Sequence, residues 1–309
     1  MYFIEPKVEI IDQKPGKQGI FEQIEKGARI CYKSENKTEF NEEGESLTAR
    51  KFVDNILNVK KHTSVAEHGT VYLKFPIDDK NVEKYCNNKY SKVVSDPDYL
   101  YVTTNYRVLL ENNWLDDLKA PYLCEVPEDK HIRRITVKFW TQVAIAREAH
   151  RHRVHSPSEE STRYCNYSKD KFGNEISICE PEFLKNEGSY YKIASYDNTK
   201  NKEAWLLNYC RTISSDYNNP WFDKVDYWLF ANIACEYSYL GMIKLGAKPE
   251  EARTILPLDT KTEFYHTAFE DDWKTFLDMR TANVAHDDIK VLAHDLKKQF
   301  IERGYKEFE

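Results

Sequence analysis

Residues 147–167 hold more groups able to bind anions and transfer protons than any other segment of the chain, and they read REAHRHRVHSPSEESTRYCNY. The arginines and histidines of this segment are Arg147, Arg151, Arg153, Arg163, His150, His152 and His155. A guanidinium stays charged at any working pH and presents a planar fork of donors that grips phosphate or carboxylate. Histidine titrates near neutral pH when it is unperturbed. The segment therefore indicates an anion site that can move protons, although a basic cluster also fits a solvated face or a nucleic-acid patch.

The residues that follow this cluster are short, polar and rich in turn formers and hydroxyls. Residues 156–164 read SPSEESTRY, a composition typical of turns, and we predict a loop that wraps a small polar ligand. The run before the cluster, residues 137–149, is apolar enough to be a strand that turns into a buried helix. A scaffold element is therefore expected to hold the cluster in place.

Arg151-His152-Arg153 is followed by seven residues and then by Ser161, and this pattern resembles the signature of flavin-dependent thymidylate synthases. The longer form of that signature has a glutamate before the serine and Arg-Tyr after it, and Glu159 and Arg163-Tyr164 stand at these positions. The resemblance implies reductive methylation of dUMP to dTMP, with methylenetetrahydrofolate as the carbon donor. It also implies that FAD, reduced by NADPH, supplies the hydride, and that the flavin is bound between the subunits of a homotetramer.

The resemblance extends beyond the signature, over segments between residues 28 and 290. Residues 62–68 are similar to a family segment beside the flavin, residues 252–257 to one whose arginine contacts the nucleotide, and residues 276–280 to a helix whose last arginine reaches the uracil ring. The substrate-binding residues that the resemblance implies are Glu148, Arg151, Glu159, Ser161, Arg163, Arg253 and Arg280. The implied cofactor-binding residues are His62, Ser64, Arg151, His152, Arg153, Glu159 and Thr275.

Methylation at C5 of the uracil ring requires that the ring be activated, and the signature contains no cysteine nucleophile. Cys165 lies just beyond it. An arginine against the N3/O2 edge of the pyrimidine would stabilise the developing negative charge instead, and Arg280 is the candidate by resemblance. Ser161 is either a nucleophile or a hydrogen-bond donor, and we favour the binding role because no adjacent base is evident. Arg280 and Ser161 are therefore the candidate catalytic residues.

Several positions depart from the family pattern. Glu148 replaces a usual glutamine, and Ser158 replaces an asparagine. Phe269 and Thr275 stand where asparagines contact the flavin in the family, and Asp271 stands where an arginine is common. These departures predict altered contacts to the flavin, and Glu148 beside an arginine that binds phosphate could change the nucleotide preference.

Two other classes of function fit the same residues. His150, His152 and His155, with Glu159 or His68, could bind a metal and hydrolyse a phosphoester. Alternatively, the basic segment with Tyr164 and Tyr167 could bind RNA without catalysing a reaction. Visible absorbance of bound flavin would distinguish the synthase from a zinc enzyme, and strong salt dependence of binding would favour RNA.

The composition limits the remaining possibilities. The chain has 309 residues, 41% of them hydrophobic, and a net charge of −6, so it can bury a sizeable core and is not a general polyanion binder. Its seven cysteines include no Cys-x-x-Cys pair, which argues against a disulfide framework and a structural zinc site. There is no Gly-rich dinucleotide fingerprint, no signal-peptide pattern and no apolar run of ~18 residues. We expect a cytoplasmic protein whose partners are small molecules and neither nucleic acid nor a membrane.

The pattern of hydrophobic residues predicts an α+β fold with a largely antiparallel sheet and packed helices, in a single domain over residues 1–309. A polar, turn-rich insertion is expected at about 76–130, with a strand over 99–104 and a short helix over 106–110. Other strands are predicted over 2–11, 70–75, 133–139 and 260–268, and a strand with a loop within 165–184. Helices are predicted over about 17–32, 47–60, 141–150, 203–215, 222–245, 249–253, 271–280 and 285–303. In the helix over 222–245, the stripe of Val225, Leu229, Ile233, Tyr237, Leu240 and Ile243 is expected to be core or subunit interface.

Overall fold

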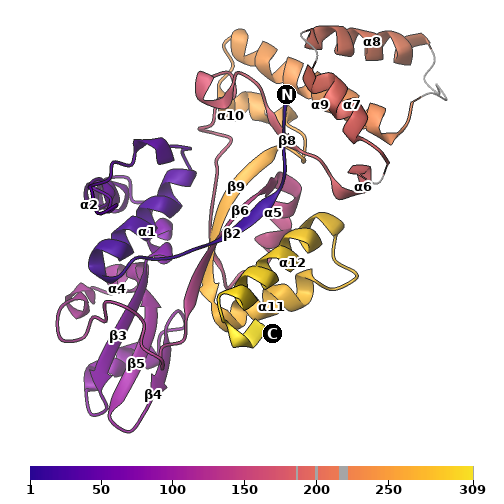
Figure 1. The fold of residues 1–309 in the computed structure, drawn as a ribbon. Coiled ribbons are helices and arrows are strands. Elements are labelled where there is room, and N and C mark those ends of the chain that lie inside the picture. Colours follow the sequence, from indigo (N-terminus) through magenta and orange to yellow (C-terminus); the bar gives the residue numbers. More distant parts are fainter. Residues whose placement is uncertain (186, 199–200, 216–221, 309) are drawn as a thin grey trace.

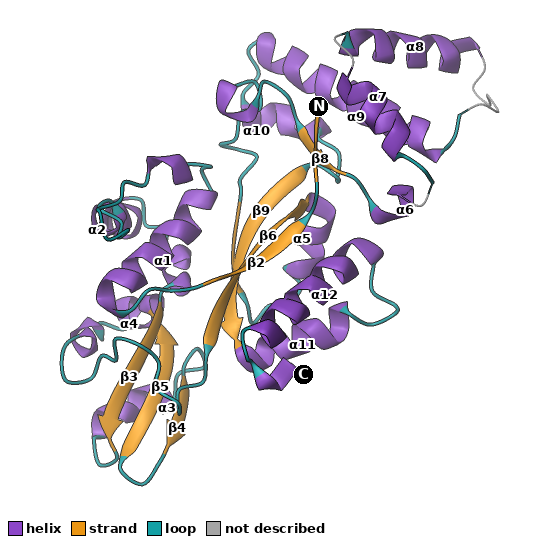
Figure 2. Cartoon of the chain, viewed as in Figure 1, coloured by secondary structure: helices purple, strands orange, loops and turns teal. Residues whose placement is uncertain are grey.

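The computed structural model describes residues 1–185, 187–198, 201–215 and 222–308. A four-stranded antiparallel sheet lies at the centre (Figures 1 and 2), in the order β2 (Lys7–Ile11), β6 (Arg134–Gln142), β9 (Lys261–Phe269), β7 (Ser156–Glu159). The longest pairing joins β6 to β9, from Arg134 opposite Phe269 to Gln142 opposite Lys261. Helices surround this sheet, so the predicted α+β class is confirmed.

One face of the central sheet is largely apolar because hydrophobic residues alternate with polar ones along β2 and the first part of β6. Val137, Phe139 and Phe264 are buried on this face. They pack with α5 (Val143–Ala149), α11 (Glu270–Arg280) and α12 (Asp287–Glu302), which lie on the same side of the sheet (Figure 1). The predicted strands over 133–139 and 260–268 and the helices that follow them are confirmed, with ends shifted by a few residues.

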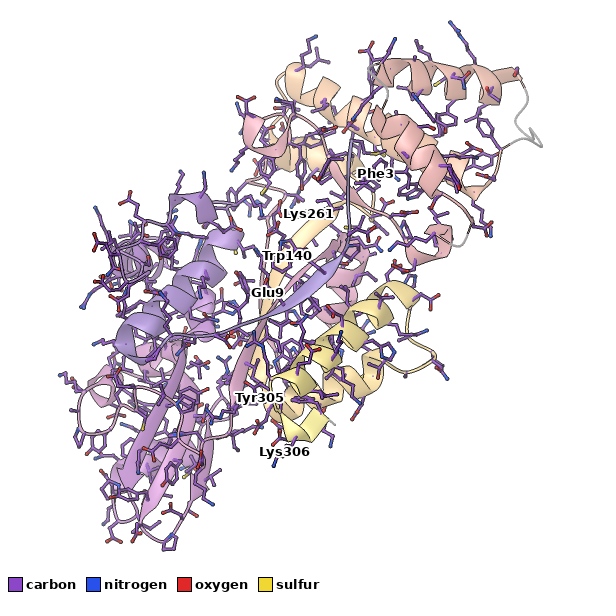
Figure 3. All side chains as sticks on the ribbon, in the orientation of Figure 1. Phe3, Glu9, Trp140, Lys261, Tyr305 and Lys306 are labelled. Carbon is purple, nitrogen blue, oxygen red and sulfur yellow. The ribbon has the colours of Figure 1, made fainter. Side chains whose placement is uncertain are left out.

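The opposite face of the central sheet is polar and lies toward α1 (Gly16–Ile30) and a 3₁₀ segment, Thr63–His68. His68 bonds the hydroxyls of Thr267 and Ser158 at 2.7 and 2.8 Å. Gly27 of α1 permits this close approach, since a Cβ there would lie 2.4 Å from Cδ2 of His68. Figure 3 shows Glu9, Trp140 and Lys261 following the sheet along its length.

A second sheet holds β3 (Thr70–Pro76), β5 (Tyr99–Asn105) and β4 (Lys92–Ser95), all antiparallel, at the lower end of Figure 1. Its core includes residues of α1, α2 (Ala49–Asp54) and α4 (Tyr106–Glu111), while α3 (Glu83–Cys86) connects β3 to β4. The predicted helix over 47–60 continues past α2 as a π-helical turn, Asn55–Val59. Residues 76–130 thus supply two strands to a sheet that contains β3, and the strand and helix predicted within them are confirmed.

The third part of the chain lies beyond the other end of the central sheet. Here β1 (Tyr2–Ile4) pairs in parallel with β8 (Ser177–Cys179). The prediction of a single strand over 2–11 is therefore wrong, because this segment forms two strands, β1 and β2, in different sheets. The helices of this part are α6 (Glu182–Lys185), α7 (Tyr190–Asn198), α8 (Lys202–Ser215), α9 (Lys224–Lys244) and α10 (Pro249–Ala252). None of the helices within the described ranges is long and apolar enough to cross a membrane.

The stripe predicted along α9 is only partly correct. Val225, Leu229 and Ile233 are buried, but Tyr237 is 59% exposed, and Tyr239 faces the core in its place. A spacing of four residues advances about 40° too far at each step of an α-helix, so a strict i+4 stripe rotates away from the core.

Candidate active site

The signature segment starts at the end of α5 and runs into an edge strand of the central sheet. Residues 150–155 form a turn, and Ser156–Glu159 then form β7, which pairs with β9. The prediction of a ligand-wrapping loop over 156–164 is therefore wrong for its first part. An edge strand accommodates Pro157, which has no N–H to donate, because only one side of such a strand is paired.

Arg280, the last residue of α11, is bonded to two residues of the signature region. Its Nη1 donates to Oε2 of Glu148 at 3.0 Å, its Nη2 to the backbone oxygen of Glu148 at 2.7 Å, and its Nε to Nε2 of His152 at 3.1 Å. Burial and the charge of Arg280 lower the pKa of His152 to about 4, so the ring is neutral and can accept this bond. The structure thus brings three predicted site residues into direct contact.

Three histidines and Glu159 form a second group beside the first. His150 Nε2 lies 3.0 Å from Oε2 of Glu159, and His150 Nδ1 lies 2.9 Å from Nε2 of His266. His266 Nδ1 in turn lies 3.1 Å from Nδ1 of His155, and the hydroxyl of Thr262 donates to Oε1 of Glu159 at 2.8 Å. Sequence reasoning missed His266. The available signal was its place in the alternating pattern of β9: it lies on the same face as Phe264 and Ala268, and a histidine is unusual on an apolar face.

A third group lies on the surface after β7. Tyr164 packs against Tyr32 with ring centroids 5.0 Å apart and ring planes tilted by 38°, and the Tyr32 hydroxyl bonds Nδ1 of His62 at 2.9 Å. The backbone N–H of Ser161 donates to the carbonyl of Cys31 at 3.3 Å. This network brings His62, a predicted flavin contact, beside the signature, and Tyr32 is a second residue that sequence reasoning missed.

Two predicted phosphate-binding arginines border this surface. Arg253 donates to the hydroxyl of Thr162 at 3.4 Å, and Arg163 lies 3.8 Å from Glu250, with half of its side chain exposed. Within the described residues no contact joins either arginine to Arg280. The two sets of predicted substrate residues are therefore not in contact with each other on one chain.

Arg151, Arg153, Ser64 and Thr275 are exposed. Among the described residues neither the Arg151 nor the Arg153 guanidinium has a hydrogen-bond or ion-pair partner, so both groups can receive an anionic ligand. The hydroxyl of Thr275 donates to the carbonyl of Asp271 at 3.2 Å, within its own helix. The structure does not bring Ser64 or Thr275 into contact with the signature.

The two alternative functions fit this geometry poorly. In the part of the chain that the structure describes, no group of three or more His, Cys, Asp or Glu residues is placed to hold a metal ion. The proposed ligands His150 and His155 instead direct ring nitrogens at His266. Tyr167, offered as a stacking surface for RNA, is only 2% exposed. The metal site on His150, His152 and His155 and the stacking role of Tyr167 are therefore both wrong.

The residues present fit a flavin in part. Exposed His62 and Ser64 and the unpaired forks of Arg151 and Arg153 are suitable donors for a cofactor with phosphates. By contrast, Phe269 is buried beneath Lys92, whose Nζ is 4.5 Å from the ring centroid, and Lys92 is also paired with Asp271. Position 269, predicted by resemblance to face the flavin, and position 271, where the family commonly has an arginine, thus both make contacts within the protein.

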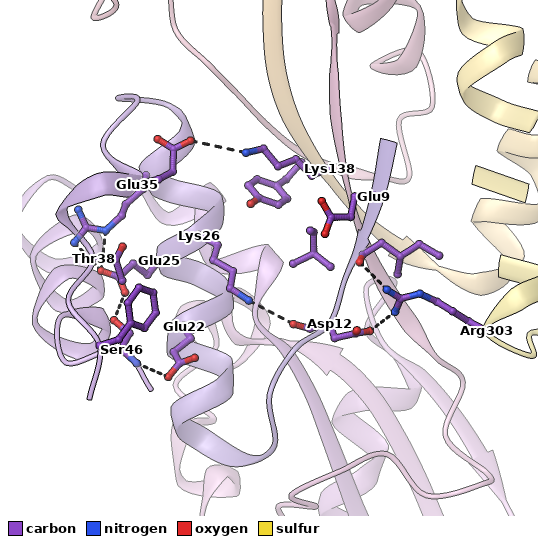
Figure 4. Close-up of a pocket in the computed structure, with 15 residues that line it drawn as sticks. Glu9, Asp12, Glu22, Glu25, Lys26, Glu35, Thr38, Ser46, Lys138 and Arg303 are labelled. Carbon is purple, nitrogen blue, oxygen red and sulfur yellow. Dashed lines mark hydrogen bonds and ion pairs between the residues drawn. The ribbon is translucent and has the colours of Figure 1, made fainter. Parts of the chain in front are cut away.

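Figure 4 shows a cavity of about 480 Å³ between α1 and β2. Its lining mixes acids and bases, including Glu22, Glu25, Lys26 and Arg303, and contains none of the predicted site residues. The cavity lies on the polar side of the central sheet, whereas Arg280 and His266 lie on the apolar side, so this cavity is separate from the candidate site.

No curated protein matches the chain. Among solved structures, thymidylate synthase X from Helicobacter pylori with FAD and dUMP covers 98% of this chain and 97% of its own, at 12% identity and a TM-score of 0.41. A UMP/dUMP methylase, PolB, from Streptomyces cacaoi bound with 5-Br UMP covers 98% of this chain and 92% of its own, at 15% identity and a TM-score of 0.39. Both similarities are distant.

A family model described as thymidylate synthase complementing protein matches residues 132–303, which include the whole signature, Arg253 and Arg280. The match covers more than half of the chain. The chain therefore belongs to the thymidylate synthase complementing protein family, the flavin-dependent thymidylate synthases.

Proposed function

We propose that this protein methylates dUMP to dTMP, with methylenetetrahydrofolate as the carbon donor and FAD, reduced by NADPH, as the source of the hydride. The single observation that carries the proposal is the set of bonds from Arg280 to Glu148 and His152. These bonds fix an arginine at the signature, inside the residues that match the family.

Arg280 is proposed to lie against the N3/O2 edge of the uracil ring, where negative charge develops during activation. A donor held in place before the reaction stabilises that charge without reorganising. Glu148 and His152 supply this restraint, because each nitrogen of the guanidinium donates one bond to them, which leaves two of its five N–H groups for the ring edge. The carboxylate of Glu148 also offsets part of the charge of Arg280, which makes it a determinant of how strongly the ring edge is bound.

The phosphate of the nucleotide is proposed to be bound by Arg151, Arg163 and Arg253, with Ser161 as a hydrogen-bond donor. Arg163 donates its backbone N–H toward the Ser161 hydroxyl at 3.4 Å. In the described ranges no carboxylate or imidazole is bonded to that hydroxyl, so a base for a serine nucleophile is not evident. The binding role of Ser161 therefore remains the better supported one.

His62, Ser64, Arg151, Arg153 and Thr275 are proposed to hold the flavin, together with His152 and Glu159. A bound flavin supplies hydride chemistry that no side chain can provide. The residues of this chain bind its phosphates and orient the nucleotide.

We also propose that the enzyme is a cytoplasmic homotetramer. No contact among the described residues joins Arg280 to the pair Arg163 and Arg253, so a second subunit would complete the site. All seven cysteines are free thiols, which is consistent with a reducing compartment.

The test is to assay dTMP formation from dUMP with methylenetetrahydrofolate, FAD and NADPH, and to record the visible spectrum of the purified protein. We expect flavin absorbance and dTMP, both of which should persist in Arg50→Ala, since Arg50 is exposed on α2, away from the signature. Absence of dTMP with a folded, flavin-loaded protein would overturn the proposed reaction.

A further inference from the structure

An open pocket of about 440 Å³ lies where the segment after α1 meets the polar face of the central sheet. We call it the lysine pocket, and the residues that line it are Lys33, Glu35, Asn36, Lys138, Trp140, Lys171 and Glu263. Lys33 directly follows Tyr32, whose hydroxyl bonds His62. The lysine pocket therefore adjoins the surface proposed to bind flavin, although it contains none of the predicted site residues.

The two acids of the lysine pocket are held with different strength. One carboxylate oxygen of Glu263 lies 2.5 Å from Nζ of Lys33, and the other lies 2.9 Å from Nζ of Lys138. Burial alone would raise the pKa of Glu263, but these two ammonium groups and that of Lys261 lower it to about 2. Glu35 makes longer contacts, at 3.5 Å from Lys33 and 4.0 Å from Lys138, and its side chain is 34% exposed. Glu35 is therefore the acid that an incoming carboxylate can displace.

Three ammonium groups in and around the lysine pocket have no carboxylate within ion-pair distance among the described residues. Each of them lies over an aromatic ring, at 4.1, 4.9 and 4.9 Å from the centroid: Lys7 over Trp140, Lys60 over Tyr32 and Lys171 over Phe172. A ring face attracts an exposed cation by about 0.5–1 kcal/mol, so it orders the side chain but does not neutralise it. The N–H groups of these lysines thus remain available to an anionic ligand.

The excess of positive charge at the lysine pocket is local. The whole chain has a net charge of −6, so most of its surface repels a long polyanion. Glu9, opposite Lys138 on β2, lines the cavity of Figure 4 and not this pocket. Because each lysine binds an anion as a separate point charge, lysines spread along a surface suit a flexible chain of carboxylates better than one compact anion. The arrangement fits a short chain of this kind that runs from Tyr32 toward Trp140.

We propose that the lysine pocket binds the glutamate tail of the folate co-substrate and selects folates by the length of that tail. The inference rests on the proposed function, in which methylenetetrahydrofolate is the carbon donor. The end of this molecule that carries the one-carbon unit must lie near the flavin and the uracil ring, whereas its other end is a glutamate. Each additional γ-linked glutamate adds one carboxylate. The tail passes Lys60, its next carboxylates replace Glu35 at Lys33 and bind Lys171, and the last ones reach Lys7.

The first experiment measures binding of γ-linked pentaglutamate, without folate, to the flavin-loaded full-length protein. Isothermal titration at low ionic strength, where screening is weak, gives the dissociation constant. Lys171→Gln should weaken binding about 2–5-fold, the range of an exposed ion pair. Glu35→Gln should strengthen binding by a similar factor, because it removes the carboxylate that competes for Lys33. The matched control is Lys89→Gln, since Lys89 is also exposed and lies over an aromatic ring, at 4.8 Å from the Tyr90 centroid, but outside the pocket.

Changes of opposite sign in Lys171→Gln and Glu35→Gln would identify an effect of charge, because a general loss of structure weakens binding in both variants. Lys89→Gln should bind the peptide as the wild type does. An unchanged dissociation constant in Lys171→Gln, or an equal loss in Lys89→Gln, would overturn the tail site. A single-stranded RNA that displaces the peptide and responds to the same substitutions would also overturn it, because the pocket would then bind polyanions in general.

The second experiment compares the KM values of methylenetetrahydrofolate with one glutamate and with five. In the wild type the longer form should have a KM about 10-fold lower, since several exposed ion pairs each contribute a small factor. Lys7→Gln, at the far end of the pocket, should raise the KM of the longer form about 2–5-fold and leave kcat and the KM of the shorter form within about twofold. Equal KM values for both forms in the wild type would overturn the tail site, even though dTMP is formed. Conversely, a protein that binds pentaglutamate as expected but forms no dTMP from either folate would refute the proposed reaction and leave the lysine pocket as a site for chains of carboxylates.

Discussion

Arg280 and Glu148 connect the last residue of α11 to the last turn of α5, through one bond to the carboxylate at 3.0 Å and one to the backbone oxygen at 2.7 Å. The backbone contact matters because it does not depend on the side chain at position 148. An uncharged residue there would leave the guanidinium anchored to the end of α5. The charge of Glu148 is therefore free to vary without loss of the position of Arg280.

Arg280→Ala is expected to lower the rate at saturating dUMP by about 10²–10³, as loss of an oxyanion-hole donor does. The reason is that charge on the ring develops only during the reaction, where Arg280 is proposed to act. Single-turnover oxidation of reduced flavin, titrated with dUMP, separates the rate from the dissociation constant. A variant that changes only the dissociation constant would refute the activating role.

Arg151→Ala is expected to weaken ligand binding and to leave the rate at saturating dUMP unchanged. Its exposed fork is proposed to hold a phosphate in the ground state, so its loss should weaken binding of dUMP or FAD by ~1.5–3 kcal/mol, the scale of a charged hydrogen bond. Isothermal titration of each ligand measures this, with Arg50→Ala as the control for loss of an exposed arginine. If binding is intact and only the saturated rate falls, Arg151 is not a ground-state contact.

Cys165→Ala and Cys31→Ala are expected to retain dTMP formation. Burial raises the pKa of both thiols, and Cys165 is fully inaccessible, so neither is poised as a thiolate. Activity is measured alongside the thermal unfolding midpoint, because Cys165 fills space in the core. Complete loss of activity in a folded variant would mean that ring activation is covalent.

The flavin-loaded protein should have the mass of a homotetramer. The physical reason is that no contact among the described residues joins Arg280 to the pair Arg163 and Arg253, so we expect neighbouring subunits to complete the site. Light scattering coupled to gel filtration gives the mass, and absorbance at the flavin band reports loading. A monomer that retains flavin would contradict this arrangement.

Glu263 should make the free energy of unfolding depend on pH in the acidic range. Burial alone would raise its pKa, but Lys261, Lys138 and Lys33 lower it to about 2. A carboxyl group whose pKa is lowered in the folded state stabilises the folded protein at pH values above its unfolded-state pKa, ~4.3. This stabilisation is lost as the pH falls toward the folded-state pKa of about 2. Glu263→Gln should therefore reduce the free energy of unfolding at neutral pH by on the order of 3 kcal/mol. Urea unfolding should show this difference shrinking in acid.

The matched control is Glu9→Gln, an exposed glutamate on β2, which is separated from β9 by β6 in the same sheet. We expect its unfolding midpoint to follow the wild type at every pH. A pH-independent deficit in Glu263→Gln would assign the loss to packing and not to charge.

Local pattern predicted the elements that carry the site, because alternation of apolar and polar residues along 133–139 and 260–268 indicates a strand directly, although both β6 and β9 are buried along nearly all of their length. It could not show that Ser156–Glu159 is a strand, since this short segment of three polar residues and a proline pairs only because β9 offers an unpaired edge. It also could not place Arg280 on Glu148, or His266 between His150 and His155, since these contacts join residues more than 100 positions apart. The signature identified the family, and the long-range pairing determined which of its residues meet.

Pro157 has one further consequence, for how copies of this chain can associate. It occupies the edge strand of the central sheet, where the outer row of backbone groups is the natural template for a strand from another molecule. A strand added there would meet no backbone N–H at position 157, so one inter-strand hydrogen bond could not form. Growth of a continuous sheet across subunits is thus disfavoured at this edge, and assembly is directed to side-chain surfaces.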